Sequence, residues 1–177
     1  ILEEFQKAGY PVLTQDSLPI DPPMLEKLFG DEVRQGVIPD AMDISDAWKN
    51  SYSENTSRKV WAAKYTARHP NLVALELSSF KCGHDAPIYS VVEEIIEDSG
   101  TPYFSFKDID ENKPTGSIRI RVETITYFLT RYREELARKK QIETRVEAKI
   151  REFEAGLRAG LAGKLSLAET GLASAAG

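Results

Sequence analysis

The chain's single cysteine, Cys82, lies in a polar segment whose side chains can bind metals or anions. The residues around it are Lys81, Gly83, His84 and Asp85. Pro87 follows as the expected first residue of a helix. Nearby cations and the positive end of a helix both favour the thiolate, which is the form of cysteine that binds metals. The alternative is a small, buried cysteine in a tight turn between a strand and a helix, and the local sequence favours the two interpretations equally.

A second polar segment carries three carboxylates, and two arginines follow it. Asp108, Asp110 and Glu111 lie close together in a combination that is able to bind a divalent cation. Their spacing matches no known calcium loop, so turn formation and solvation are the favoured interpretation. Arg119 and Arg121 stand near the start of the next helix, where positive charge opposes the helix dipole and needs partners. We expect the carboxylates to be those partners, with an anionic ligand as the alternative.

The numbers of cysteines and histidines limit the metal chemistry of this chain. It contains 1 cysteine and 2 histidines, which is fewer than the four ligands of a structural zinc site or an iron–sulfur cluster. A cluster bound by Cys82 therefore needs ligands from outside the chain, and we expect no cofactor in the isolated chain. Phosphate-binding loops, dinucleotide-binding glycine fingerprints and nucleophile elbows are also missing from the sequence. A complete active site is not visible.

Packing is the expected role of the other conspicuous side chains. His84 is more simply explained as a histidine on the loop surface than as half of a metal pair with Cys82. His69 precedes Pro70 at the end of a predicted helix, where capping and packing are expected. Core positions are also expected for Trp48, Tyr52 and Trp61.

Charge and composition exclude several classes of partner. Lys and Arg together number 23 and Asp and Glu 28, which gives a net charge of −5 and an isoelectric point of about 5.2. Nucleic-acid binding is disfavoured because phosphate backbones are held by clustered positive charge. No apolar run approaches the roughly 18 residues of a membrane span. The single cysteine and the missing secretory signal favour the cytoplasm. Because the chain begins at Ile1, we expect it to be a piece of a longer protein.

The first part of the chain is predicted to form short elements separated by glycine and proline. Residues 1–8 are predicted to be the end of a helix that Gly9 closes. Residues 10–14 are predicted to form a short strand. A proline pair opens a short helix over 24–29, which Gly30 is expected to end.

Helix and strand alternate in the middle of the chain. Residues 53–69 and 87–97 are predicted helices, and residues 72–77 and 103–106 are predicted strands, the first of them buried on both faces. This order predicts an α/β fold, a Rossmann-like three-layer domain with a short parallel sheet. Ligands bind at the carboxyl ends of parallel strands. We therefore expect both polar segments to open at the same edge of the sheet.

The last predicted element is a long helix over residues 118–158, or a helical hairpin. Its apolar stripe is interrupted at 138–141 and is interpreted as resuming in a shifted phase, which indicates either a coiled-coil stutter or a turn. A small domain cannot obviously cover the second half, so we expect that half to contact another domain or to form a homodimer. The chain is therefore divided into an α/β domain (1–130), a helical extension (131–160) and a low-complexity tail (161–177).

Both polar segments resemble one known family. Residues 75–87, LELSSFKCGHDAP, are similar to the cysteine segment of the 2-hydroxyacyl-CoA dehydratase superfamily. Residues 106–112, FKDIDEN, and 116–124, GSIRIRVET, resemble that family's Asp-Glu-His, Gly and Thr-Arg-hydrophobic-Glu pattern. The resemblance covers roughly residues 43–129. It is greatest to the C-terminal dehydratase-like part of the large acyl-CoA dehydratase activase-related proteins, which carry an ATPase of the BadF/BadG/BcrA type.

The resemblance implies a function that no single domain performs alone. In that family, Rossmann-like domains hold an iron–sulfur cluster through cysteines from different domains, and an ATPase domain delivers a low-potential electron. Cys82 would be one cluster ligand. Asn112 stands where the family usually has His, and Ile120 stands where Thr is common. The expected function is therefore an electron-transfer or dehydratase-type module, inactive alone. The alternatives are a non-catalytic interaction or dimerisation domain, and a domain that binds a small anionic ligand at Arg119 and Arg121.

Overall fold

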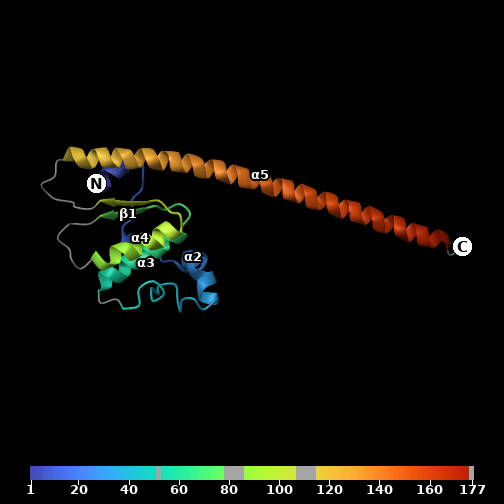
Figure 1. Ribbon diagram of the computed structural model, residues 1–177, viewed down its shortest axis with the longest axis horizontal. Coiled ribbons are helices and arrows are strands. Elements are labelled where there is room, and N and C mark those ends of the chain that lie inside the picture. Colours follow the sequence, from blue (N-terminus) through green and yellow to red (C-terminus); the bar gives the residue numbers. More distant parts are fainter. Residues whose placement is uncertain (51–52, 78–85, 107–114, 176–177) are drawn as a thin grey trace. The chain divides into compact units, whose positions relative to one another are not determined.

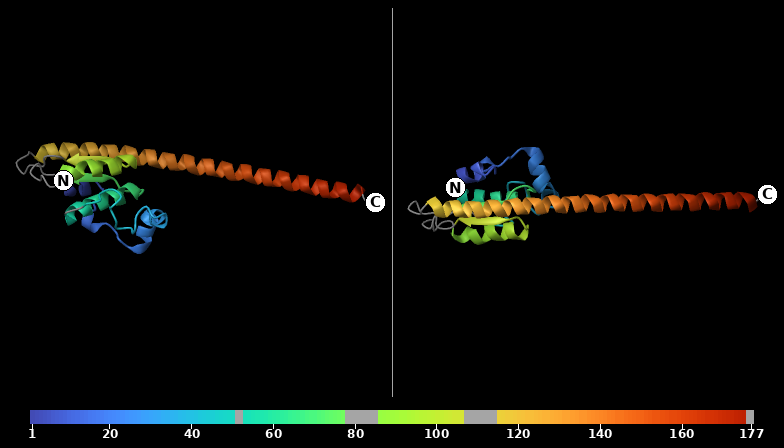
Figure 2. Two further views of the ribbon diagram at one scale, coloured as in Figure 1. Left: turned by 60° about the horizontal axis from the view of Figure 1, so that its bottom comes forward. Right: turned by 90° about the horizontal axis from the view of Figure 1, so that it is seen from above.

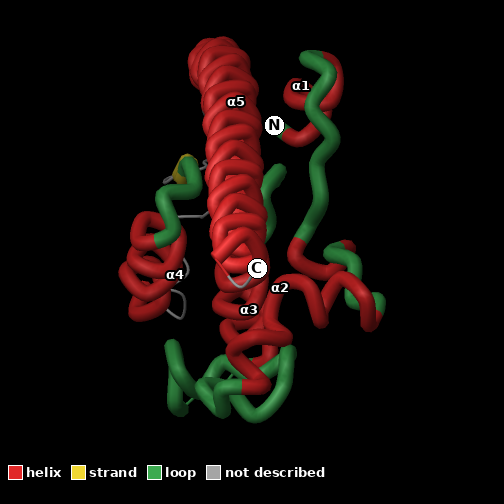
Figure 3. Tube along the Cα trace, turned by 90° about the vertical axis from the view of Figure 1, so that its right-hand side faces the viewer, coloured by secondary structure: helices red, strands yellow, loops and turns green. Residues whose placement is uncertain are grey.

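The computed structural model describes residues 1–50, 53–77, 86–106 and 115–175 (Figure 1). The elements in chain order are α1 (Leu2–Lys7), the 3-10 helix η1 (Gln15–Ser17), α2 (Pro22–Arg34), α3 (Glu54–Arg68), β1 (Ala74–Leu77), α4 (Ala86–Asp98), β2 (Tyr103–Phe106) and α5 (Thr115–Ala175). Helix predominates over strand throughout the described residues (Figure 3). The chain divides into two compact units, Ile1–Ile125 and Thr126–Gly177.

The first unit is built around a two-stranded parallel sheet. The register pairs Ala74 with Tyr103 at one end and Leu77 with Phe106 at the other. Because side chains alternate along a strand, Ala74 and Tyr103 share one face and pack against α3 and α4. Leu75 and Phe106 share the other face and pack against α1 and the first turns of α5. Helices therefore cover both faces of the sheet. A Rossmann-like domain would add further strands to the two that the described residues show.

Several predicted elements are confirmed with small changes at their ends. The predicted helix over 1–8 is α1, which Gly9 follows with a φ of 84°. The helices predicted over 53–69 and 87–97 are α3 and α4, and the strand over 103–106 is β2. These segments share a clear periodicity of apolar residues, and that periodicity is what packing of the core requires.

Residues 10–14 do not form the predicted strand. They belong to no helix or strand, and Pro11 has no amide hydrogen to give to a sheet. Tyr10 and Val12 pack instead on the cluster that contains Phe5 and Phe106. The apolar residues of this segment therefore pack on the core without joining the sheet.

The predicted end of the second helix is also wrong. Helix α2 runs through Gly30 to Arg34, and the turn after it contains Gly36 with a φ of 70°. Its start is as expected, since Asp21 accepts a hydrogen bond from the amide of Met24 at 3.1 Å and two prolines follow. Glycine inside a helix is tolerated, and only the left-handed position requires it.

The strand predicted over 72–77 is shorter and less buried than expected. It begins at Ala74, whose amide donates to the carbonyl of Pro102 at 3.0 Å. Leu72 packs on the core between α2 and α3. Leu77 is 38% exposed. The apolar run over residues 72–77 therefore packs against more than one hydrophobic cluster. Its continuity does not mean that the strand is buried on both faces.

Helix α5 is continuous from Thr115 to Ala175 (Figures 1 and 2). Of the two alternatives for residues 138–141, a stutter or a turn, the turn is therefore absent. The segment predicted as a low-complexity tail is helical as far as Ala175. Ile118, Val122 and Ile125 belong to the first unit and pack with Phe5 and Phe106. The helix after Ile125 forms the second unit.

Candidate functional site

The two strands end as neighbours at the edge where the candidate segments begin. Leu77 and Phe106 are register partners and are the last residues of β1 and β2. Helices α4 and α5 begin at Ala86 and Thr115 after these segments. The strand–segment–helix order occurs twice, and both copies start from the same edge of one parallel sheet.

Eight of the predicted site residues lie outside the described residues. They are Lys81, Cys82, Gly83, His84, Asp85, Asp108, Asp110 and Glu111. Tyr52 lies outside them as well. The predicted pairing of the acidic loop with arginine therefore stays a prediction.

Arg119 and Arg121 are described, and each has a partner near the start of α5. The Nε of Arg119 lies 3.1 Å from a carboxylate oxygen of Glu123, one helical turn further on. The guanidinium of Arg121 lies 5.8 Å from the centroid of the Phe106 ring, at cation–π distance. Phe106 is buried and ends β2. Arg121 therefore lies beside the end of the strand from which the acidic segment departs.

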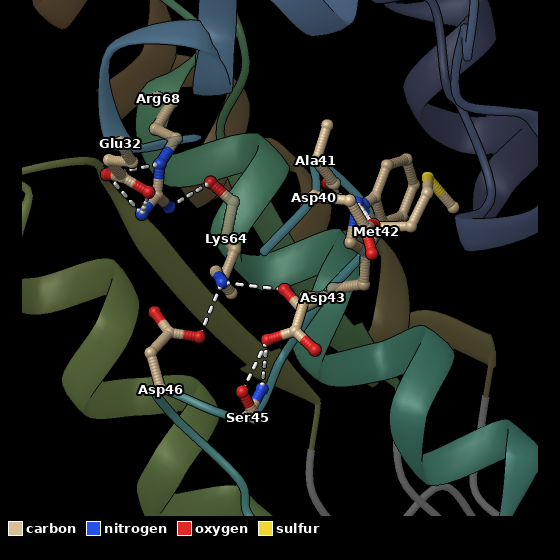
Figure 4. A network of polar contacts seen from close by, with 10 residues as sticks. Glu32, Asp40, Ala41, Met42, Asp43, Ser45, Asp46, Lys64 and Arg68 are labelled. Atoms are coloured by element: carbon tan, nitrogen blue, oxygen red, sulfur yellow. Dashed lines mark hydrogen bonds and ion pairs between the residues drawn. The ribbon is translucent and has the colours of Figure 1, made fainter. Parts of the chain in front are cut away.

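A buried lysine, Lys64, is the most unusual charged group among the described residues. It lies on α3 and is 1% exposed. Its Nζ donates to the carbonyl oxygen of Asp43 at 2.8 Å and to a carboxylate oxygen of Asp46 at 2.6 Å (Figure 4). A buried ammonium group is tolerated when it is paired and hydrogen-bonded in this way. Lys64 therefore fixes the loop that precedes α3.

The loop that Lys64 holds has its own supporting hydrogen bonds. The carboxylate of Asp43 accepts from the amide of Ser45 at 2.8 Å and from its hydroxyl at 2.5 Å, and these bonds lower the pKa of Asp43. One turn before Lys64, the indole of Trp61 donates to the carbonyl of Ala41 at 2.9 Å. Two successive turns of α3 therefore anchor the loop, and the prediction that Trp61 belongs to the core is confirmed.

Arg68 makes a second ion pair one turn further along α3. Its Nη2 lies 2.7 and 2.8 Å from the two carboxylate oxygens of Glu32, on α2 (Figure 4). Its guanidinium also lies 5.0 Å from the ring centroid of Phe29. This bidentate geometry joins α2 to α3 and gives the pair a defined orientation.

A cavity of about 330 Å³ lies beside these two ion pairs. Its lining residues include Glu32, Asp46, Lys64, Arg68 and Asp98. The two cations in the lining already bind carboxylates, so the wall offers no uncommitted positive charge to an anion. The arrangement can hold α2, α3 and the loop in fixed positions, and it contains no nucleophile paired with a base.

His69 and Tyr103 are also held in structural roles. His69 stacks on Tyr65 with ring centroids 5.9 Å apart, and its Nδ1 accepts from the amide of Asn71 at 3.2 Å. This stacking confirms packing as the role of His69. Burial, with a smaller effect from Lys27, lowers the pKa of His69 and favours the neutral ring. Burial and the hydrogen bond to Glu76 raise the pKa of Tyr103 well above its ordinary value, so Tyr103 keeps its proton.

Sequence reasoning missed the ion pairs of Lys64 and Arg68 although a signal was present. Both residues fall on the helical stripe that includes Val60, Trp61 and Tyr65. A charged residue on an apolar stripe is a candidate for a buried ion pair. The partners, on α2 and the loop, lie 18 or more positions away in the sequence, and no local pattern identifies them.

Two general searches of the described residues bear on metals and membranes. Within those residues, no group of three or more histidine, cysteine or carboxylate side chains is arranged to hold a metal ion. Among the described helices, none is both long enough and apolar enough to cross a bilayer.

Comparison with known proteins does not identify a relative. No family model matches the sequence, and neither the curated proteins nor the solved structures provide a match.

Proposed function

We propose that this chain is one module of an ATP-dependent, low-potential electron-transfer system of the 2-hydroxyacyl-CoA dehydratase type. In this proposal Cys82 gives one thiolate to an iron–sulfur cluster, and other domains or chains give the remaining ligands. The chain is inactive alone, and an ATP-hydrolysing partner supplies the electron. The two-stranded sheet would be part of a Rossmann-like three-layer domain in a cytoplasmic protein.

The observation that supports this proposal most directly is the pairing of Leu77 with Phe106. The two segments that resemble the dehydratase family follow these residues, so they leave the sheet from adjacent positions at its carboxyl edge. That edge is where α/β proteins bind their ligands. A site divided between two such segments and a second protein surface fits this geometry.

The chain can supply only one of the thiolate ligands that an iron–sulfur cluster needs. The sequence has one thiolate donor, whereas a cluster usually needs four. The chain alone therefore does not hold a cluster, and the proposal gives it one ligand and one wall of the site. The anionic-ligand alternative gains no support from the described residues, in which Arg119 binds Glu123 and Arg121 stacks on Phe106.

The test is to remove the thiol in the complete assembly that supplies the other thiolates. Cys82→Ser is expected to abolish or strongly reduce the visible absorbance and the electron paramagnetic resonance signal of the cluster after anaerobic purification. Ser79→Ala, in the same segment, is the matched control and is expected to keep both signals. Circular dichroism is expected to be the same for both variants.

The isolated chain provides the second arm of the test. Incubated anaerobically with ferrous iron and sulfide and then desalted, it is expected to retain no cluster absorbance, because one thiolate cannot retain a cluster. If the Cys82→Ser assembly keeps its iron and its reduction by the ATPase partner, the ligand assignment is wrong and Cys82 is a packing residue.

A further inference from the structure

Helix α5 carries one heptad pattern that continues from the first unit into the second. Ile118, Val122 and Ile125 occupy successive d, a and d positions and are covered by the α/β core. The same register continues along the second unit, where an apolar seam, called here the distal seam, consists of Tyr132, Leu136, Val146, Ile150, Phe153 and Leu157. Two heptads separate Leu136 from Ile150, so the stripe keeps its phase across 138–141. Of the exposed apolar residues between 136 and 157, Ile142 alone departs from this register.

The distal seam is exposed from Leu136 to Leu157, and Tyr132 at its start is half-buried. Val146 and Ile150 are 49% and 52% exposed, and Phe153 reaches 69%. The described part of the second unit is a single helix, so this unit has no second element of its own to cover the residues from Leu136 to Leu157. Apolar a and d positions repeated over several heptads are the pattern of a coiled coil, whose helices bury the seam against each other.

We propose that the distal seam binds a second copy of this chain, with the two α5 helices parallel and in register as a two-stranded coiled coil. Each apolar layer then faces its own copy, from Tyr132 to Leu157. This proposal rests on α5 alone and is independent of any role for Cys82.

The two polar positions in the seam fit the parallel register. Lys139 occupies a d position and Glu143 the next a position. In the parallel register each Lys139 faces the same lysine of the second copy and each Glu143 faces the same glutamate, and these two layers are adjacent. The opposite charges of the adjacent layers offset part of the repulsion within each layer, whereas a shift of one heptad would place these charged side chains against apolar layers. Polar residues at core positions set register in this way at some cost in stability.

The residues that flank the seam are complementary in the same register. In a parallel dimer each g residue lies near the e residue five positions further along the second copy. These pairs are Glu135 with Lys140 and Lys149 with Glu154. Each pair joins opposite charges and occurs twice, once on each side of the dimer. No pair of like charges occurs at the g and e positions between residues 128 and 161.

An antiparallel dimer fits the same residues less well. The antiparallel register that joins Lys139 to Glu143 brings the two Lys140 side chains together but also pairs Glu135 with Lys149, so the flanking charges do not distinguish the two orientations. It also sets Leu157 opposite Ile125, which is already packed in the α/β core. The parallel register instead gives Phe153 and Leu157 apolar partners and leaves the core residues of the first unit in place.

The first test measures the mass of the 177-residue chain in solution by sedimentation equilibrium. The wild-type chain is expected to be a dimer. Phe153→Glu places a charge in the seam of both copies and is expected to weaken association by at least about a hundredfold. Ala155→Glu puts the same side chain two positions away, on the opposite face of α5, and is expected to remain dimeric. Equal helix content by circular dichroism shows that Phe153→Glu still folds.

The second test determines the orientation by disulfide formation in a Cys82→Ser background. Ile150→Cys is expected to form a disulfide with its own copy, because identical a positions face each other in a parallel dimer. In the antiparallel register described above, Ile150 faces Tyr132. That dimer would instead give a mixed disulfide between Tyr132→Cys and Ile150→Cys chains, and none between two Ile150→Cys chains.

A wild-type chain that stays monomeric at all concentrations tested would overturn the proposal. A dimer that Phe153→Glu leaves intact would overturn the role of the distal seam. A dimer with only the mixed disulfide would overturn the parallel register. The cluster absorbance of the complete assembly tests Cys82 separately, so the two proposals can fail independently.

Discussion

At the scale of single residues, Lys64 shows how a charge is kept inside a small domain. Its ammonium group donates hydrogen bonds to one carbonyl and one carboxylate oxygen, both on the loop before α3, in place of hydrogen bonds to water. The side chain of Asp46 is 28% exposed and that of Lys64 only 2% exposed. Lysine therefore carries most of the desolvation of the pair, and the loop is the element that depends on it.

Lys64→Met is expected to lower the free energy of unfolding by about 1–3 kcal/mol, because it preserves the packing volume but leaves the Asp43 carbonyl without its donor. Urea unfolding followed by circular dichroism measures this loss. Lys27→Met, on the exposed side of α2, is the matched control and should stay within about 0.5 kcal/mol of wild type. A loss no larger than that of the control would show that the buried pair contributes nothing net.

His69 predicts a dependence of stability on pH. Its pKa in the folded protein is lowered below the ordinary value of about 6.5, so the unfolded chain binds a proton first as the pH falls. The stabilisation is complete above the unfolded pKa and is lost as the pH falls through the folded pKa. His69→Gln removes the titrating ring and should reduce the change in unfolding free energy across that range. Equal slopes for wild type and variant would contradict the assignment.

At the scale of elements, the ends of the helices were the least predictable features. Gly30 and Gly36 are both candidates to end α2 in the sequence, but only Gly36 has a left-handed backbone. Local propensity cannot distinguish them, because the choice depends on the packing of Val33 against the core of Phe29 and Tyr65. Periodic segments such as α4 were predictable because their apolar stripe is itself the buried face.

Gly36→Ala is expected to cost about 1–2 kcal/mol of stability, because an L side chain is strained at a φ of 70°. Gly30→Ala gains helix propensity, and its new methyl group meets only the carboxylate end of Glu26, a flexible side chain. It should therefore be clearly less destabilising than Gly36→Ala. Thermal melts of both variants measure the difference, and the reverse order would mean that the clash at Gly30 dominates.

For the candidate site, the sequence predicted only the strands and helices that surround it. The sequence correctly indicated two strands and the helices that follow them, and the pairing of Leu77 with Phe106 follows from that pattern. The ion pairs of Lys64 and Arg68 were not foreseen, because each joins α3 to a partner far away in the sequence. The role of Cys82 stays a prediction.

At the scale of the whole molecule, the phase of the α5 stripe determines which residues the proposed dimer would bury. The sequence interpretation placed a shift at 138–141, since Ile142 lies off the seam. With a continuous helix, the remaining apolar residues occupy a and d positions of a single register. Ile142, which lies outside the a and d positions, was therefore interpreted as a change in the phase of the apolar stripe.

Charge exchange tests the parallel register without altering the apolar seam. Lys149→Glu places two glutamates at each g–e contact and is expected to weaken the dimer several-fold, more at low salt than at high salt. The double variant Lys149→Glu/Glu154→Lys restores opposite charges and should return the dissociation constant to within about twofold of wild type. Sedimentation equilibrium measures all three chains. If the second substitution does not restore the dissociation constant, Lys149 and Glu154 do not contact each other across the dimer.

The burial of Lys64 also has a consequence for chemical reactivity. An amine reacts with acylating reagents only when its nitrogen is accessible, and the Nζ of Lys64 is enclosed by the loop over residues 40–48. Acylation of Lys64 must therefore wait for that loop to leave α3, whereas Lys27 reacts from the native surface. The ratio of the two labelling rates gives the free energy of this local opening. The labelling rate of Lys64 therefore reports how often the loop that it holds detaches from α3.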